Sequence, residues 1–268
     1  MSVPANTSTV YGPVKSWRVG NSLGIDPILK RSTCSFNCIY CQLGSIQRVT
    51  LQRQAFVTTE QVVEDFAASD WTSADVITYS GSGEPTLATN LGEMIMAIRG
   101  ISPTPQVVLT NGTLLHHEEV VRDLALADEV SVKLDAASDE MLKKVNRPAA
   151  GVSIKQILRD IKQFRRTYAG KLAAQVMLMP SNIKEINELV DVVADIGFDE
   201  IQLNTPTRPY PTRWHVSARG GHSPLQRHYR STPLKKIPQE TAVEAERLFR
   251  ERCKKPVRSV YQSGSAGQ

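Results

Sequence analysis

Short runs of apolar, mostly β-branched residues alternate along this chain with longer segments in which apolar residues recur every three or four positions. The short runs are typical of buried strands, and the longer segments are typical of amphipathic helices. The predicted strands are residues 74–80, 105–111, 128–135, 172–180 and 199–204, with one more near residues 22–29. The predicted helices between them are residues 58–68, 90–100, 116–127, 152–169 and 182–197.

Regular alternation of this kind implies parallel strands joined by right-handed helical crossovers. Six strand–helix units are too few to close an eight-stranded barrel. The pattern therefore predicts an α/β fold in the form of an open, partial (β/α)6 barrel. Ligands of such folds collect at the carboxyl ends of the strands, and the loop at residues 31–45 follows the first predicted strand to that end.

The periodicity stops after Asn204, which suggests a core barrel with its N-terminal segment at 1–204 and a mostly irregular extension at 205–268. Within the extension, residues 239–253 have the pattern of a short helix. Although the whole chain has a formal net charge of +5, residues 201–239 contain no Asp or Glu. The cations of that stretch are Arg208, Arg213, Arg219, Arg227, Arg230, Lys235 and Lys236.

Aromatic residues are interleaved with these cations at Tyr210, Trp214 and Tyr229. The combination agrees with a surface that binds phosphates and offers rings on which bases can stack. The alternative is that the cations pair with the slightly acidic barrel, so that the extension folds over the barrel as a lid.

Three of the four cysteines, Cys34, Cys38 and Cys41, form a C-x3-C-x2-C pattern in which Tyr40 precedes the last sulfur. Structural zinc requires four closed ligands, and disulfide frameworks belong to small, cysteine-rich secreted chains. The spacing instead favours an iron–sulfur cluster, for which proteins that only carry electrons normally supply four cysteines. A cluster held by three cysteines would keep one iron open as a binding site.

The fourth cysteine, Cys253, lies far along the chain and is interpreted as a free thiol, with completion of the cluster site as the alternative. The composition, with 41% hydrophobic and 22% charged residues, is that of a soluble globular protein. No apolar run approaches the ~18 residues of a membrane span, and the N-terminal residues lack the pattern of a secretory signal. A cluster with exposed thiolates also needs a reducing compartment, so we expect a cytoplasmic protein without membrane contact.

With this cysteine spacing, the sequence resembles the radical S-adenosylmethionine (SAM) superfamily. YGPVKSWRVGNSLGIDP before the motif, QLG after it and IQLNTPTRP further on are similar to the branch of wyosine-forming tRNA enzymes and their uncharacterised bacterial relatives. The resemblance implies a partial barrel of the radical SAM type and a [4Fe–4S] cluster whose open iron chelates the amine and carboxylate of SAM. It also implies reductive cleavage of SAM to a 5′-deoxyadenosyl radical, with an electron donor such as flavodoxin or ferredoxin as a partner.

The same resemblance suggests residues that bind the cofactor. The superfamily has a Gly-Gly-Glu-like element that binds the SAM ammonium, and Ser82-Gly83-Glu84 stands at that place, with serine in place of the first glycine. We count Tyr40 of the cysteine motif with these residues. The alternative for the Ser82–Glu84 segment is an ordinary strand-to-helix turn.

Two further strand ends carry polar candidates for SAM binding. Asn111 could hydrogen-bond a ribose hydroxyl, although an Asn before Gly also favours an Asx turn or a helix N-cap. Lys133 and Asp135 have the same side-chain parity on one strand, so both could point into the barrel and meet the SAM carboxylate or a substrate. The alternative is a structural pair, because buried charges need partners.

The substrate is the least determined part. The resemblance to wyosine-type enzymes implies a modified guanine in tRNA, which residues 206–236 would bind, with pyruvate as a carbon donor. However, no cysteine precedes Cys34 to hold the second cluster of those enzymes, and the lysine that would hold pyruvate has to be Lys15 or Lys30. The alternatives are a radical SAM enzyme for a small molecule or peptide, with the extension as a lid, and a non-catalytic iron–sulfur module that binds nucleic acid.

Overall fold

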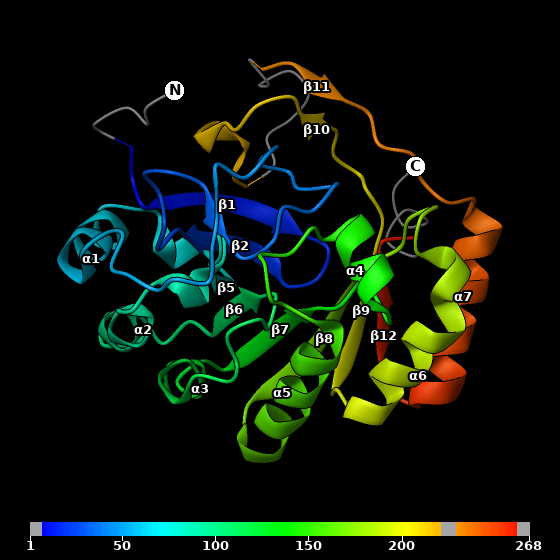
Figure 1. The fold of residues 1–268 in the computed structure, drawn as a ribbon. Helices are drawn as coiled ribbons and strands as arrows, with labels where there is room; N and C mark the ends of the chain where they lie inside the picture. The colour runs from blue at the N-terminus through cyan, green and yellow to red at the C-terminus, as the bar shows by residue number, and fades with distance from the viewer. Residues whose placement is uncertain (1–6, 221–228, 262–268) are drawn as a thin grey trace.

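The protein is described from a computed structural model that places residues 7–220 and 229–261. An eight-stranded sheet runs through the molecule in the order β1-β2-β5-β6-β7-β8-β9-β12 (Figure 1). All neighbouring strands from β2 onward are parallel, and only β1 pairs antiparallel with β2. The bounds of the strands are β1 Val10–Ser16, β2 Gly20–Ile25, β5 Val76–Tyr79, β6 Gln106–Thr110, β7 Glu129–Lys133, β8 Lys171–Met177, β9 Glu200–Asn204 and β12 Val257–Ser259.

Helices cover the outer face of the curled sheet, as Figure 1 shows. They are α1 Thr59–Ala67, α2 Leu91–Arg99, α3 Glu118–Leu124, α4 Asp139–Val145, α5 Ile154–Thr167, α6 Ile186–Ile196 and α7 Gln239–Cys253. Several begin and end where the sequence indicates. The side chains of Thr58 and Ser153 cap α1 and α5, and Gly197 ends α6 in the left-handed conformation. The predicted partial α/β barrel is therefore confirmed.

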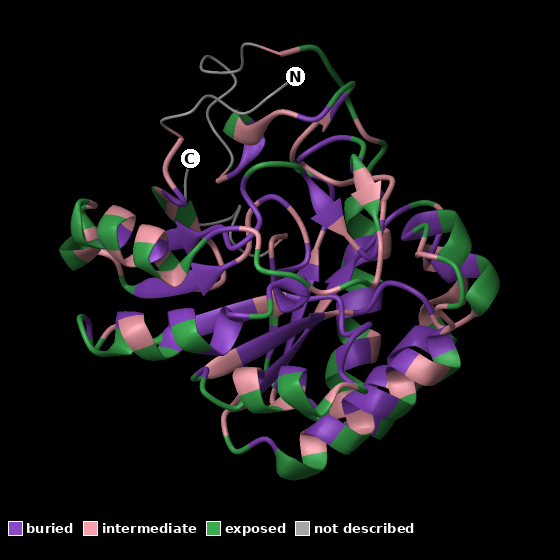
Figure 2. Cartoon of the chain, turned by 60° about the vertical axis from the view of Figure 1, so that its left-hand side comes forward, coloured by how far each residue is buried: buried purple, intermediate pink, exposed green. Residues whose placement is uncertain are grey.

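Burial follows these layers, with buried strands inside and helices exposed only on their outer faces (Figure 2). The core joins residues from every large strand to the inner faces of the helices. Its largest fully buried side chains include Tyr79, Phe164 and Phe249. Among the placed residues, no helix has the length and apolar character needed to cross a membrane.

Among the elements of the main sheet and its helices, β1, β12 and α4 were not predicted from the sequence. The strand β1 lies at the sheet edge and is only partly buried, so its residues lack a strong apolar alternation. The strand β12 has 3 residues and the helix α4 has 7, which is too short for a clear periodic signal. Each is stabilised by an existing neighbour: β12 adds to β9, and the side chain of Ser138 caps α4.

The chain after β9, predicted to be an extension, does not stay apart from the barrel. Residues 205–220 and 229–238 lie outside the sheet, and within them β10 Tyr210–Pro211 pairs with β11 Ser231–Thr232. The chain then returns, because α7 packs beside α6 and β12 becomes the last strand of the sheet (Figure 1). We call residues 205–220 the strap, since they cross the carboxyl ends of the strands.

Candidate active site

A cavity of about 390 Å³ lies within the curve of the sheet and opens toward the carboxyl ends of the strands. All three cysteines of the motif line it, together with strand residues and part of the strap. Of the cofactor-binding residues predicted from the sequence, those in the cavity lining are Tyr40, Gly83, Glu84, Asn111 and Lys133. The fold thus brings together residues that are up to 99 positions apart in the sequence.

The cysteines lie on a loop between β2 and β5 that contains a small parallel pair, β3 Thr33–Cys34 and β4 Arg48–Val49. Backbone turns shape the loop: the amide of Cys41 donates to the Cys38 carbonyl at 3.1 Å. The carboxyl end of α4 anchors it, since the amide of Ile39 donates to the Val145 carbonyl at 2.9 Å. The helix that the sequence did not reveal therefore positions the cysteine loop.

The three thiols share an environment that resists deprotonation in the absence of metal. Burial raises the pKa of Cys38 to about 11 and that of Cys41 to about 12, and it raises the pKa of Cys34 well above its usual value. A bound cation reverses this balance, because coordinated thiols are held as thiolates. Amide nitrogens donate to two of the sulfurs: Phe36 at 3.3 Å and Asn111 at 3.7 Å to Cys34, and Asn146 at 3.4 Å to Cys38.

This donor set fits a cluster better than a single ion. Among the residues that the structure places, no three His, Cys, Asp or Glu side chains are grouped to hold one metal ion. A [4Fe–4S] cube takes each thiolate on a different iron, so its ligands do not need to converge on one point. Cys253 lies on α7 with its sulfur 4.0 Å from the Val190 carbonyl oxygen and does not line the cavity.

Glu84, which is 2% exposed, has a carboxylate whose acceptor positions are already used by the protein. One oxygen accepts from the hydroxyls of Thr86 and Thr110 at 2.7 Å each and from the Thr86 amide at 3.2 Å. The other accepts from the amide of Asn111 at 2.8 Å. Glu84 thus braces the ends of β5 and β6 against each other. Its predicted bond to the SAM ammonium stays a prediction, and the observed contacts give the side chain a structural role.

The two residues before Glu84 also differ from expectation in their contacts. The hydroxyl of Ser82 donates to Asp26 at 2.6 Å, and Ser82 does not line the cavity. The serine that replaces the first glycine of the superfamily element therefore bonds within the protein. Gly83 pairs with Thr33 of the cysteine loop, and a Cβ at Gly83 would overlap the Thr33 carbonyl. The close approach of two backbones therefore explains the glycine.

Asn111 adopts the Asx turn that was the alternative for this residue. Its side-chain oxygen accepts from the amide of Thr113 at 3.1 Å, and its Nδ2 donates to the hydroxyl of Ser35 at 2.7 Å. The side chain therefore links the end of β6 to the cysteine loop. Its predicted bond to a ribose hydroxyl stays a prediction.

Lys133 and Asp135 form the structural pair that was their alternative, with 2.6 Å between Nζ and Oδ1. The carboxylate of Asp135 is fully buried and also accepts from the Tyr40 hydroxyl, from Asn146 and from the amide of Met177. Burial lowers the pKa of Lys133, and Asp135 partly offsets this effect. Lys133 still reaches the cavity, where its Nζ lies 5.2 Å from the centre of the Tyr40 ring.

The strap makes contacts that the sequence did not predict residue by residue. Arg219 donates to the buried carboxylate of Asp26 at 2.9 Å, and its guanidinium lies 5.0 Å from the centre of the Tyr11 ring. Trp214 packs with Leu43 and Ile46 of the cysteine loop in a separate hydrophobic cluster. The only sequence signal for these contacts was the unbalanced charge of residues 201–239.

Comparison with known proteins assigns the class that this barrel and its cysteines define. The radical SAM superfamily matches residues 30–193, more than half of the chain, and the chain belongs to that superfamily. Within it, the chain is 46% identical over 215 residues to the UPF0026 protein slr1464 of Synechocystis, which covers 80% of this chain and 81% of that protein. Radical SAM enzymes use a [4Fe–4S] cluster and SAM, so this protein is an enzyme of SAM-dependent radical chemistry.

Solved structures share the fold. Archaeal TYW1 superposes with a TM-score of 0.54 at 14% identity, over 89% of this chain and 74% of that one. SuiB of Streptococcus suis bound to S-adenosylmethionine superposes with a TM-score of 0.59 at 13% identity, over 85% of this chain. The match spans only 48% of SuiB, so the likeness concerns the barrel and not the whole of that protein.

Proposed function

We propose that Cys34, Cys38 and Cys41 hold the [4Fe–4S] cluster and that SAM binds in the adjoining cavity. When bound, the two cofactors supply reductive cleavage of SAM to a 5′-deoxyadenosyl radical, which takes hydrogen from the substrate. The observation that carries this proposal is the gathering of the three thiols at one cavity, on a loop that β5, β6 and α4 brace from three sides. An electron donor of the flavodoxin or ferredoxin type is part of the proposal.

The protein's own contribution is position and exclusion of water. The Ser82–Glu84 segment pairs through its backbone with Thr33, so that the predicted SAM loop and the cysteine loop form one rigid unit. The Lys133–Asp135 pair and Tyr40 form a polar wall beside it. A site held this way can orient the reacting groups without rearranging. Such preorganisation lowers the activation barrier.

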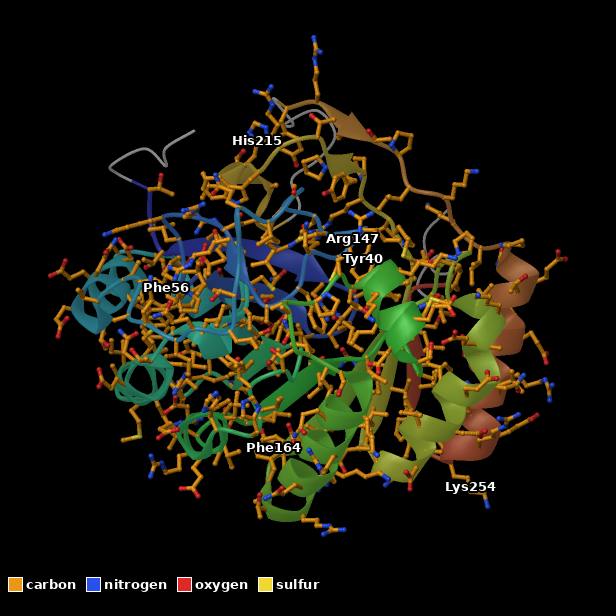
Figure 3. The ribbon with its side chains drawn as sticks, in the orientation of Figure 1. Tyr40, Phe56, Arg147, Phe164, His215 and Lys254 are labelled. Carbon is orange, nitrogen blue, oxygen red and sulfur yellow. The ribbon has the colours of Figure 1, made fainter. Side chains whose placement is uncertain are left out.

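The position of the strap favours a substrate enclosed in the barrel, that is, a small molecule or a peptide end. Gly44 of the cysteine loop lies so close to the strap that a Cβ there would meet the carbonyls of Pro211 and Arg213 at 2.7 Å. Figure 3 shows His215 of the strap above Tyr40 and Arg147, which lie by the cysteine loop. This arrangement supports the lid that was one alternative for the extension.

The test is anaerobic reconstitution followed by an assay for 5′-deoxyadenosine with dithionite as reductant. Wild-type protein is expected to form 5′-deoxyadenosine from SAM, and the triple variant Cys34→Ala/Cys38→Ala/Cys41→Ala is expected to form none. Cys253→Ala is the matched control, because Cys253 lies outside the cavity. Absence of 5′-deoxyadenosine from wild-type protein that carries a full cluster would refute the proposal.

A tRNA base remains the second candidate substrate, because exposed cations continue past the strap. Arg213, Arg230, Lys235 and Lys236 are exposed, and His215 stacks on Tyr229 with 4.9 Å between ring centres. Arg219 and Arg208 do not belong to this surface, since they contact Asp26 and Gln42 in the barrel, and Arg227 lies outside the described residues.

Titration of labelled bulk tRNA at two salt concentrations tests this candidate. Binding through phosphates is expected to weaken steeply with salt, because each neutralised phosphate releases counterions. The variant Lys235→Ala/Lys236→Ala is expected to bind more weakly and to show a smaller salt dependence. If wild-type protein binds no tRNA at low salt, tRNA is excluded as the substrate, and a small molecule or peptide end enclosed in the barrel remains.

A further inference from the structure

Arg18 lies in the turn between β1 and β2 and lines the same cavity as the three cysteines. Although the residue as a whole is half-buried, its Nε and Nη1 have no contact with solvent and no hydrogen-bond partner. The guanidinium makes no ion pair with any described residue, although Glu129 attracts its charge, and its carbon lies 5.8 Å from the centre of the Trp17 ring. Arg18 therefore lines the cavity without a direct ion-pair partner among the described residues.

Two other arginines with little exposed side-chain surface, Arg53 and Arg219, each have a carboxylate partner. Arg53 bonds Asp123 at 3.0 Å and the carbonyls of Thr86 and Ala88 at 2.9 and 3.2 Å. Arg219 bonds Asp26 at 2.9 Å and the carbonyls of Ser8 and Val216. The chain thus satisfies guanidinium groups where they serve the fold, and Arg18 departs from that pattern.

No carboxylate of the cavity is available to Arg18. Glu129 attracts it, but the oxygens of Glu129 are engaged by Lys171 at 3.1 Å and by Gln202 at 3.3 Å. Glu84 is used by the strand ends, and Asp135 is used by Lys133. Burial lowers the pKa of Arg18 to about 10, and the charge of Arg208 adds to this effect. The guanidinium nevertheless stays charged at neutral pH, so it needs an anion.

We propose that Arg18 binds an oxyanion of the substrate, a carboxylate or a phosphate, inside the barrel. A guanidinium donates charge-assisted hydrogen bonds to either group, and Nη2 is the Arg18 nitrogen that keeps accessible surface. Lys15, Lys133 and Arg208 also line this cavity, and of these Lys133 is paired with Asp135. The inference deepens the proposed function and rests on it, because it names the chemical class of the enclosed substrate.

The test measures thermal unfolding of the cluster-loaded, SAM-saturated protein with sodium phosphate, sodium succinate or sodium chloride at equal ionic strength. An anion that binds only the folded state is expected to raise the wild-type Tm by about 5 °C at roughly one hundred times its dissociation constant. Arg18→Met is expected to lose this shift, whereas Arg122→Met, an exposed arginine on α3, is expected to keep it. A shift by phosphate alone or by succinate alone assigns the class of the anion.

The same melts are repeated without SAM, and three results would overturn the proposal: no shift with either anion in either state, an equal shift in Arg18→Met, or a wild-type shift that is seen without SAM and lost with it. The last would show that the SAM carboxylate occupies Arg18. If Arg18→Met does not fold, Arg18→Lys replaces it, and its shift is expected to be smaller than that of wild type because an ammonium does not reproduce the planar guanidinium geometry. The 5′-deoxyadenosine assay is independent of these measurements. If Arg18 binds an anion but the protein does not cleave SAM, the proposed radical SAM function is refuted and the anion site is not.

Discussion

Individual side chains at this site serve mainly to hold strand ends and loops in place. Glu84, Asn111 and Asp135 were singled out by the sequence as cofactor ligands, and each has protein partners for its polar atoms. Buried polar groups cost free energy unless they are paired, so these bonds stabilise the geometry that the cofactors need. Positioning the cysteine loop is the role that the structure itself displays for them.

Replacing Glu84 tests this role. Glu84→Ala removes the acceptor of several buried donors and is expected to destabilise the SAM-free protein by about 2 to 4 kcal/mol. Thermal unfolding without SAM measures this effect, with Glu60→Ala on the exposed side of α1 as a control. A wild-type Tm together with SAM binding weakened roughly 10- to 150-fold would instead show that Glu84 bonds the SAM ammonium directly.

The cysteines give a prediction at the same scale. Reconstituted protein is expected to hold about four irons per chain, the content of one cube. Single Ala variants of Cys34, Cys38 and Cys41 are expected to lose the cluster, and Cys253→Ala is expected to keep it. Iron analysis and the visible absorbance measure both. Loss of iron from Cys253→Ala would contradict the assignment of an open iron.

At the scale of elements, the strap and the cysteine loop behave as one layer over the barrel. Trp214 packs on Leu43 and Ile46, and Arg219 reaches Asp26 beside the Ser82–Glu84 segment. Breaking a buried ion pair by removing one partner leaves the other charge uncompensated. The strap is therefore expected to depend on Arg219 far more than on its exposed cations.

Hydrogen exchange of the strap tests this dependence. Arg219→Met is expected to lower stability by about 3 to 5 kcal/mol and to speed amide exchange in residues 205–220. Arg213→Met is the matched control, because Arg213 lies on the same segment and is exposed. Equal exchange rates in the two variants would show that the Arg219–Asp26 pair does not fasten the strap.

At the scale of the whole molecule, the C-terminal residues complete the sheet. β12 pairs with β9, and buried residues of α7 such as Ala242 and Phe249 belong to the main core. Deleting residues 206–268 would thus remove a strand and a helix together with the strap. Such a deletion cannot separate the role of the strap from the stability of the barrel.

Truncation after residue 238 makes this point measurable. The truncated protein is expected to lose cooperative unfolding or to aggregate, because it exposes the edge of β9 and the apolar face of α6. Circular dichroism melting and size-exclusion chromatography are the measurements. A monomer with the wild-type Tm would show that the barrel folds without α7 and β12, as the predicted division at residue 204 implies.

The sequence by itself determined the repeating strands and helices and the cysteine motif. Both depend on local spacing: burial on one side of a helix or on both faces of a parallel strand leaves a periodic pattern, and ligands on one loop leave a fixed spacing. All six predicted strands are present in the sheet for that reason. The edge strand β1 and the short β12 left no such pattern, because their stability comes from the neighbours they pair with.

Only the tertiary structure decided what the polar residues contact. Arg219 and Asp26 lie 193 positions apart, and Asn111 and Cys34 lie 77 apart, so no local spacing joins them. The sequence could place Lys133 and Asp135 on one face but could not choose between a mutual pair and a ligand site. No sequence pattern singled out Arg18, which the fold places in the lining of the cavity. Pairing of buried charges depends on which groups the chain brings together, and that is set by packing.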